Sequence, residues 1–165
     1  MSLPLIVGIS GATGVIYGIE VLKVLHKLGN PAHLILSETA VRNFAIETDY
    51  SADDVRKLAA EVYSNKDLAA AVSSGSFPTQ GMLIAPCSMK TLSGIANSFS
   101  QNLLIRAADV TLKEQRKLVL IARETPLHKG HLELMVKAAD LGAVILPPVP
   151  AFYHRPKTIM DIVHQ

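Results

Sequence analysis

A glycine-rich turn near the N-terminus contains the first residues that could hold a ligand. Gly8, Gly11 and Gly14 are spaced three apart. The turn follows an apolar run, residues 5–9, and precedes an amphipathic pattern. A strand, a turn and a helix N-terminus in this order leave backbone N–H groups at the positive end of a helix dipole. A phosphate monoester or a ring carbonyl can bind there, and Thr13 adds a hydroxyl donor.

The spacing of this turn differs from two well-known nucleotide motifs. It is neither the G-x-G-x-x-G dinucleotide fingerprint nor a G-x-x-x-x-G-K-[ST] phosphate loop. A glycine turn after a strand is also often only a chain reversal. The turn alone therefore leaves phosphate binding open, and other segments must decide it.

A second segment, Pro86–Thr91, also opens an expected helix directly after an apolar strand. Ser88 and Thr91 can cap that helix or bond a ligand, so a second anion site and a plain capping motif are both open. Cys87 has no histidine near it in the sequence. We therefore expect an inert apolar side chain there rather than a nucleophile.

Three cations could neutralise a bound phosphate: Arg106, Lys113 and Arg123. Arg106 and Lys113 are seven residues apart in one expected helix and so share a face, whereas Arg123 follows a strand. Surface cations are most often simply solvated, and Arg123 could instead pair with Glu124. Their expected position beside two helix N-termini favours a role in binding.

Acidic, histidine and aromatic residues give weaker indications. Glu47 ends an expected helix, where a solvated carboxylate is usual, and would act in catalysis only if it faced the ligand. His128 and His131 are three residues apart but lack a third ligand at a suitable spacing, so we predict no metal site. Tyr153 lies in a proline-rich loop and could stack on a ligand or donate to a phosphate, although loop aromatics usually have no such role.

The elements that would position these residues alternate between apolar strands and amphipathic helices. Strands are expected over 5–9, 32–36, 81–85, 118–122 and 143–146, with an irregular stretch between about 60 and 80. Unbroken apolar strands that alternate with helices predict a parallel sheet covered on both faces. Such doubly wound sheets bind ligands at the carboxyl ends of their strands, where the turns and loops named above would meet.

Composition indicates a single globular domain. The chain has 165 residues, of which 49% are hydrophobic and 18% charged, and a formal net charge of +2. This small charge, without clustered basic and aromatic residues, argues against nucleic acid as a partner. The single cysteine excludes an internal disulfide and favours a reducing, cytoplasmic setting. No apolar run is long enough to span a membrane, so no membrane partner is expected.

Eight segments together carry a family resemblance: Gly11–Gly14, Glu47–Asp49, Ser73–Ser76, Pro86–Ser93, Arg106–Asp109, Leu112–Glu114, Arg123–Leu127 and Pro147–Tyr153. In this order they resemble the flavin prenyltransferases of the UbiX type, formerly described as 3-octaprenyl-4-hydroxybenzoate carboxy-lyases or phenylacrylic acid decarboxylases. The resemblance covers essentially the whole chain. Each motif alone has only modest specificity, whereas the occurrence of all eight in this order is highly specific.

The resemblance implies a flavodoxin-like (Rossmann-like) doubly wound parallel sheet in three layers, a dodecameric homo-oligomer and bound FMN. It implies transfer of a dimethylallyl group from dimethylallyl monophosphate to N5 and C6 of reduced FMN, without a metal. The prenylated FMN would then serve a partner decarboxylase that acts on aromatic or α,β-unsaturated acids, as in ubiquinone synthesis.

The resemblance also assigns roles to individual positions. The residues that match FMN contacts are Gly11, Ala12, Thr13, Ser37, Ser88, Met89, Lys90, Thr91 and Arg123. Those that match the prenyl-phosphate pocket are Arg106, Lys113, Glu124 and Tyr153, and Glu47 matches an acidic catalytic position. Glu47, Lys113, Glu124 and Thr13 are the expected catalytic residues. Ionising an allylic phosphate requires cations on the departing oxygens and a π surface for the allyl cation, which this set and a flavin ring can supply.

Two alternatives stay open beside this interpretation. One is an FMN-dependent cysteine decarboxylase of the same fold, which would carry a Pro-Ala-Ser-Ala-Asn-Thr motif where Pro86–Thr91 keeps only the Pro, Ser and Thr. The other is a non-catalytic FMN-binding or carrier protein. Members of the resembled family continue past Gln165 with more helix, including a basic residue for the substrate phosphate. We therefore expect one flavoprotein domain, residues 1–165, with a truncated last helix.

Overall fold

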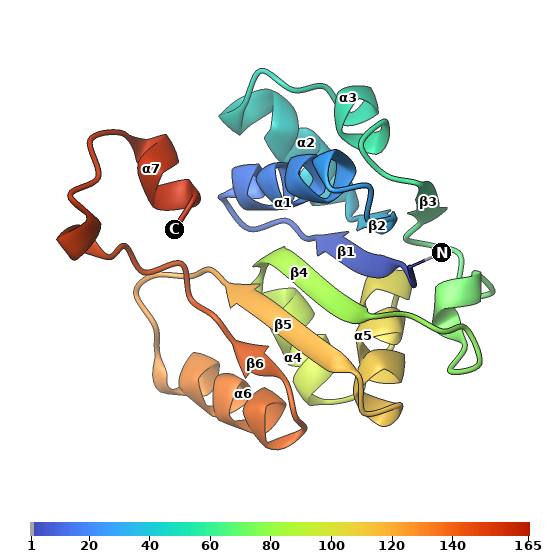
Figure 1. The fold of residues 1–165 in the computed structure, drawn as a ribbon. Coiled ribbons are helices and arrows are strands. Elements are labelled where there is room, and N and C mark those ends of the chain that lie inside the picture. The colour runs from blue at the N-terminus through green and yellow to red at the C-terminus, as the bar shows by residue number, and fades with distance from the viewer. Residues whose placement is uncertain (1) are drawn as a thin grey trace.

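A computed structural model describes residues 2–165 as a six-stranded sheet with helices on both faces (Figure 1). The strands are β1 (Leu5–Ile9), β2 (Ala32–Leu36), β3 (Glu61–Ser64), β4 (Gly81–Cys87), β5 (Lys117–Ala122) and β6 (Val144–Ile145). Their order is β3-β2-β1-β4-β5-β6, and all neighbouring strands are parallel. This is the order of Rossmann-like doubly wound sheets, with the switch point between β1 and β4. The predicted fold class is therefore confirmed.

The helices divide between the two faces of the sheet (Figure 1). One layer contains α1 (Val15–Lys27), α2 (Glu38–Glu47) and α3 (Ala52–Arg56), and the other contains α4 (Met89–Ala96), α5 (Leu103–Lys113) and α6 (Lys129–Asp140). Two 3-10 turns, η1 (Ala71–Ser73) and η2 (Phe152–His154), and a last helix, α7 (Ile159–Val163), complete the chain. Within residues 2–165, no helix combines the length and apolar character needed to cross a bilayer.

The core lies in two layers because alternate residues of the central strands face opposite helices. In β1, Ile6 packs with the α4–α6 layer, whereas Val7 and Ile9 pack with the α1–α3 layer. In β2, Ile35 and Leu34 divide in the same way. All five side chains are at most 2% exposed. A strand covered on both faces must be apolar almost throughout, which is why the apolar runs predicted the parallel sheet correctly.

The edge strand β3 is the element that the sequence analysis missed. It pairs only with β2, and of its four residues only Tyr63 is partly buried. An exposed edge strand has no apolar run, so the stretch between 60 and 80 was expected to be irregular. The error matters for function, because the residues that follow β3 line the pocket described below.

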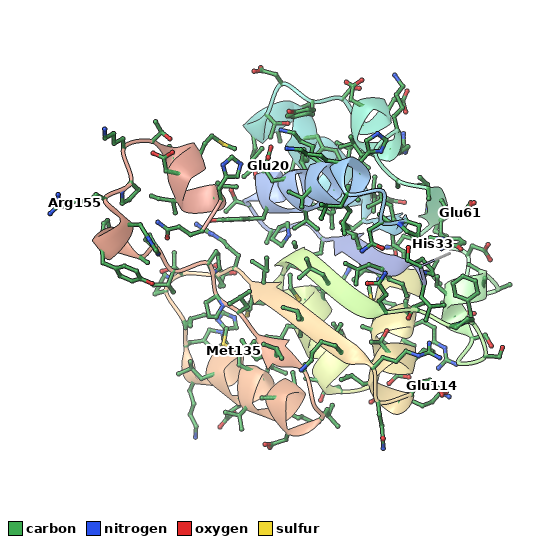
Figure 2. All side chains as sticks on the ribbon, in the orientation of Figure 1. Glu20, His33, Glu61, Glu114, Met135 and Arg155 are labelled. Carbon is green, nitrogen blue, oxygen red and sulfur yellow. The ribbon has the colours of Figure 1, made fainter. Side chains whose placement is uncertain are left out.

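The C-terminal segment leaves β6 and returns to the first helix. His164, just after α7, lies with its Nε2 atom 3.1 Å from Oε2 of Glu20 on α1. Figure 2 shows Glu20 on the side of α1 that faces α7. Lys23, one turn further along α1, also contacts this carboxylate, at 2.7 Å from Oε1. The contact between His164 and Glu20 connects the last helix to α1.

Candidate active site at the carboxyl edge of the sheet

The loops that follow the central strands meet because backbone hydrogen bonds continue past the ends of the strands. The bonds are Ser37 N–H to Ile9 O at 3.0 Å, Ser10 N–H to Pro86 O at 3.1 Å and Arg123 N–H to Cys87 O at 3.1 Å. They join the loops in the order in which their strands lie in the sheet, β2, β1, β4 and β5. The sequence predicted that these loops would converge, and the structure brings them together.

The side chain of Ser10 strengthens the junction between β1 and β4. It is 1% exposed, donates to the carbonyl of Pro86 at 2.8 Å and accepts from the amide of Ser88 at 2.7 Å. The buried hydroxyl of Ser10 thus has its hydrogen bonds satisfied within the protein. Ser10 therefore fixes where α4 begins relative to the glycine-rich turn.

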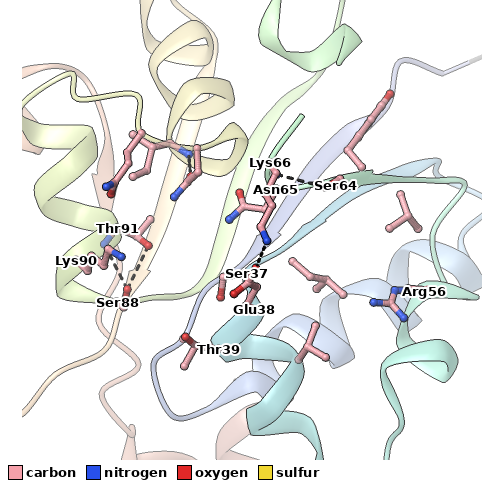
Figure 3. Close-up of a pocket in the computed structure, with 18 residues that line it drawn as sticks. Ser37, Glu38, Thr39, Arg56, Ser64, Asn65, Lys66, Ser88, Lys90 and Thr91 are labelled. Carbon is pink, nitrogen blue, oxygen red and sulfur yellow. Dashed lines mark hydrogen bonds and ion pairs between the residues drawn. The ribbon is translucent and has the colours of Figure 1, made fainter. Parts of the chain in front are cut away.

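A pocket of about 950 Å³ opens at this edge between the N-termini of α2 and α4 (Figure 3). Ser37 and Thr39 line it from the α2 side, and Ser88, Lys90 and Thr91 line it from the α4 side. The volume lies at the upper end of the range for ligand pockets in proteins. The expected FMN contacts that line it are Gly11, Ser37, Ser88, Lys90 and Thr91. Ala12, Thr13 and Arg123 belong to the loops around it, and Met89 is the first residue of α4.

Ser37 and Ser88 both cap the helices that point at the pocket. Oγ of Ser37 accepts from the amide of Ala40 at 3.0 Å, and Oγ of Ser88 accepts from the amide of Thr91 at 3.3 Å. A side-chain cap engages one of the four first-turn N–H groups that a helix leaves without intrahelical partners. The other first-turn amides can still receive an anion, so capping and ligand binding are compatible here.

The conformation of the glycine-rich turn is fixed by close packing against Thr39 and by hydrogen bonds to the carboxylate of Glu47. A Cβ atom on Gly11 would lie 2.5 Å from Cβ of Thr39, so only glycine lets the turn approach the start of α2. Gly14 adopts a φ of 95°, which favours glycine. Oε2 of Glu47 accepts from the amides of Gly14 at 2.8 Å and of Val15 at 3.2 Å.

The N-terminus of α1 is therefore occupied from within the chain. We expected its amides to be available to a phosphate, but a phosphate at Gly14 or Val15 would have to displace the Glu47 carboxylate. The structure instead favours the α2 and α4 termini as the positions for a phosphate group.

The expected position of Lys113 beside this pocket is wrong for a single chain. Lys113 is the last residue of α5, and β5 begins four residues later, so Lys113 lies at the amino edge of the sheet. A helix that follows one parallel strand must run back along the sheet before the next strand can start, which carries its C-terminus away from the carboxyl edge. Thr13 follows the carboxyl end of β1, on the opposite edge.

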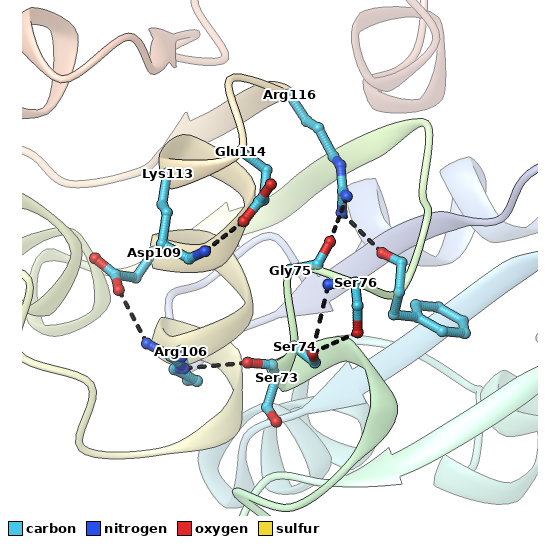
Figure 4. Close-up of polar contacts among 10 residues, drawn as sticks. Ser73, Ser74, Gly75, Ser76, Arg106, Asp109, Lys113, Glu114 and Arg116 are labelled. Carbon is cyan, nitrogen blue, oxygen red and sulfur yellow. Dashed lines mark hydrogen bonds and ion pairs between the residues drawn. The ribbon is translucent and has the colours of Figure 1, made fainter.

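Arg106 and Lys113 do share one face of α5, as predicted, and that face meets the segment 73–77 (Figure 4). Nε of Arg106 donates to the carbonyl of Ser73 at 3.2 Å, and its Nη1 atom lies 3.3 Å from Asp109. Lys113 pairs with Glu114 beside Gly75. Neither cation lines the pocket between α2 and α4.

The other expected substrate residues lie on exposed segments. Tyr153, in η2, is 81% exposed and lies 4.2 Å, ring centroid to ring centroid, from His154. Glu124 is exposed, and its Oε1 atom accepts from the amide of Thr125 at 3.0 Å. Arg123, which was expected to contact FMN, is half-buried just after β5. These three residues follow the carboxyl ends of β5 and β6, on the edge where the pocket lies.

Cys87 agrees with the sequence analysis, which expected an inert apolar side chain at this position. Cys87 is fully buried, and burial raises the pKa of its thiol to about 12, so it stays protonated and unreactive at neutral pH. His128 and His131 stack with ring centroids 3.6 Å apart. Across residues 2–165, no three His, Cys, Asp or Glu side chains lie together in a way that could hold a metal ion.

Three residues of the pocket carry no recognisable motif in the sequence: Arg56 from α3, and Asn65 and Lys66 after β3. Asn65 and Lys66 reach the pocket because β3 joins the sheet beside β2 and brings the following segment there. An exposed edge strand leaves no apolar pattern that could have located them.

The fold and the pocket define a class: doubly wound α/β proteins that bind a phosphate-bearing ligand at the switch point of the sheet. Comparison with known proteins makes the class specific. The family model described as Flavoprotein matches residues 2–164. A flavin prenyltransferase UbiX from Thauera aromatica is 59% identical over 161 residues, which cover 98% of this chain and 83% of the relative. The chain therefore belongs to the flavoproteins and, among them, to the UbiX-type flavin prenyltransferases.

Solved structures support this assignment. The chain superposes with a TM-score of 0.98 on AnUbiX in complex with FMN and dimethylallyl pyrophosphate, at 48% identity, over 100% of this chain and 88% of that one. A dodecameric FMN-dependent UbiX-like decarboxylase from Escherichia coli O157:H7 gives a TM-score of 0.96 at 49% identity, over 98% and 88% of the two chains. The FMN-dependent cysteine decarboxylase TvaF gives 0.72 at 14% identity, over 100% of both chains, which indicates a shared fold alone.

Proposed function

We propose that this protein transfers a dimethylallyl group from dimethylallyl monophosphate to N5 and C6 of reduced FMN. The observation that carries the proposal is the pocket between two capped helix N-termini, in a chain that is 59% identical to a flavin prenyltransferase. The cysteine decarboxylase alternative is disfavoured, because the similarity to that class is limited to the fold.

The residues of the pocket fit a flavin that ends in a phosphate. The N-termini of α2 and α4 present backbone N–H groups and dipoles to an anion from two sides, and Lys90 adds a charge. Gly11 lines the pocket without a side chain, and a Cβ atom there would collide with Thr39. FMN would supply the nucleophilic N5 and C6 atoms and a π surface. The chain's own part is to hold that ring, exclude water and place the second substrate above it.

The two cations expected to bind the second substrate, Arg106 and Lys113, do not line the pocket of their own chain. We infer that the partner subunit's Lys113 and the partner subunit's Arg106 complete the site in a homo-oligomer, which we expect to be a dodecamer as in the E. coli relative. Large apolar side chains on the C-terminal segment support such an interface: Val149, Phe152, Tyr153 and Ile159 are between 73% and 81% exposed. Arg123 and Tyr153 would contact the phosphate from the first chain.

In this arrangement the cations stabilise the negative charge that develops on the departing phosphate oxygens. The Thr13 hydroxyl can donate to the same group. Bond formation at N5 and C6 requires protons to move, and Glu47 and Glu124 are the carboxylates that we assign to this role. Glu47 is already held at the mouth of the glycine-rich turn by two backbone amides.

The product would serve a partner decarboxylase that acts on aromatic or α,β-unsaturated acids, as in ubiquinone synthesis. The single cysteine favours a reducing, cytoplasmic setting for both steps. The chain would act as one flavoprotein domain over residues 1–165.

The direct test is anaerobic incubation of the protein with reduced FMN and dimethylallyl monophosphate, followed by mass spectrometry of the flavin. A flavin heavier by one prenyl unit is the expected product, and an unchanged flavin contradicts the proposal. Lys113→Ala should lose transfer and keep FMN. Lys27→Ala is the matched control, because Lys27 also ends a helix at the amino edge and is exposed.

A mixing experiment tests whether the site is shared between subunits. Lys113→Ala and Arg123→Ala chains should each be inactive alone. Oligomers assembled from both after reversible dissociation should regain activity, because some sites then combine an intact Arg123 with the partner subunit's Lys113. Mixed oligomers that form but stay inactive would place both residues in the same chain's site.

A further inference from the structure

An ion pair crosses the mouth of the pocket at the α2 side. Nζ of Lys66, in the segment after β3, lies 2.6 Å from Oε1 of Glu38, the first residue of α2 (Figure 3). Both residues line the pocket, and their side chains are 83% and 66% exposed. The ammonium is thus held next to the N-terminus that Ser37 caps.

The other charged residues of the pocket indicate why this ion pair matters for anion binding. The charged residues that line it are Glu38, Arg56, Lys66 and Lys90, and Glu38 is the one acid among the described lining residues. Glu38 stabilises α2 through the helix dipole, but its charge opposes an anion at the same terminus. Arg56 is engaged by Asp53 at 2.7 Å. Lys66 is the cation that both offsets Glu38 and lies beside the site where an anion would bind.

The backbone next to Lys66 is held in place by hydrogen bonds. The carbonyl of the preceding residue, Asn65, accepts from the amide of Leu103 at 2.9 Å, and the Asn65 side chain accepts from the amide of Leu104 at 2.9 Å. The amide of Lys66 donates to Oγ of Ser64 at 3.3 Å. The segment after β3 is therefore fastened to the N-terminus of α5, and Lys66 projects from a fixed base.

We propose that Lys66 binds the phosphate of the flavin and so makes the pocket select FMN over riboflavin. This inference rests on the flavin site proposed above. An ammonium has three donors, so Lys66 can keep Glu38 as one partner and donate to a phosphate at the α2 N-terminus with another. The hydrogen bond and the charge of Glu38 also raise the pKa of Lys66, which keeps it charged throughout the physiological range.

The experiment compares FMN with riboflavin, which lacks only the phosphate. Both are titrated into the wild-type protein and into Lys66→Met, with flavin fluorescence as the readout. We expect the Kd for FMN to rise about fivefold in Lys66→Met, as for the loss of an exposed charge pair, and the Kd for riboflavin to stay unchanged. Lys66→Arg should keep most of the preference, because it retains the charge.

The matched control is Lys57→Met, because Lys57 is a similarly exposed lysine, 77%, that pairs with Asp54 and does not line the pocket. It should leave both affinities unchanged. An unchanged FMN affinity in Lys66→Met, or an equal loss for riboflavin, would overturn this inference alone. A wild-type protein that binds neither flavin would overturn the proposed function and the role of Lys66 together.

Discussion

The carboxylate of Glu47 accepts a 2.8 Å hydrogen bond from the backbone amide of Gly14, so the last residue of α2 caps the N-terminus of α1. The N-terminus of α1 has no side-chain cap from its own N-cap residue, since that residue is Gly14 itself. Glu47 therefore supplies from a distant segment what Ser37 and Ser88 supply locally for α2 and α4. A negative charge at the N-terminus of a helix also interacts favourably with the helix dipole.

This relationship predicts that Glu47 has a structural and a chemical role that can be separated. Glu47→Ala should lower stability by about 1 kcal/mol, as the loss of a helix cap does, and lower the Tm by about 3 °C. Glu47→Gln keeps an acceptor for the amides and should lose less than half of that, while prenyl transfer falls more than tenfold. Thermal unfolding and the transfer assay measure the two effects. An active Glu47→Gln variant would remove the carboxylate from the chemistry.

Arg116 should control the segment 73–77 that contacts Arg106 and Lys113. Its guanidinium donates to the carbonyls of Gly75 at 2.7 Å and Phe77 at 2.8 Å (Figure 4). Arg116→Ala leaves both carbonyls without this donor and should cost about 2 kcal/mol. Hydrogen exchange over residues 73–77 should accelerate, and Arg116→Lys should restore only part of the protection because it lacks the planar fork. Unchanged exchange in Arg116→Ala would show that other contacts hold the segment.

Cys87 should resist thiol reagents while the protein is folded. It is fully buried, and its raised pKa of about 12 leaves almost no thiolate at neutral pH. A chromogenic disulfide reagent should therefore label no thiol in the native protein and one per chain in denaturant, as the sequence has one cysteine. Rapid labelling of the native protein would mean that the β4–α4 junction opens.

The contact between α7 and α1 should depend on the charge of Glu20. Burial alone would raise the pKa of this carboxyl, but the hydrogen bonds and charges of Lys23 and His164 outweigh it and lower the pKa below its ordinary 4.5. A lowered folded-state pKa stabilises the protein above the unfolded value, and this contribution is lost as the pH falls through the folded value. Glu20→Gln should thus lower the Tm by about 3 °C at neutral pH.

The same difference should shrink as the pH falls below the ordinary carboxyl pKa of 4.5 and through the lowered folded-state value, because the wild-type carboxyl then becomes protonated as well. Thermal unfolding of both proteins across this range measures it. A Tm difference that is independent of pH would assign the effect of Glu20→Gln to packing and not to charge.

The sequence by itself determined the features that depend on neighbours along the chain. Apolar runs such as Leu5–Ile9 placed the central strands, and Ser88 was identified as a candidate helix cap because a cap acts within three residues of itself. The alternation of strands and helices then specified a doubly wound sheet and the edge where its loops converge.

Only the tertiary structure decided which distant residues meet. It placed Lys113 at the amino edge of the sheet, because α5 must run back along the sheet to reach β5. It also showed that the carboxylate of Glu47 binds the backbone amide at the N-terminus of α1. It also brought Lys66 to the pocket through β3, an edge strand whose exposed residues carry no apolar pattern. Such contacts depend on the direction and packing of whole elements, and no local spacing of residue types encodes them.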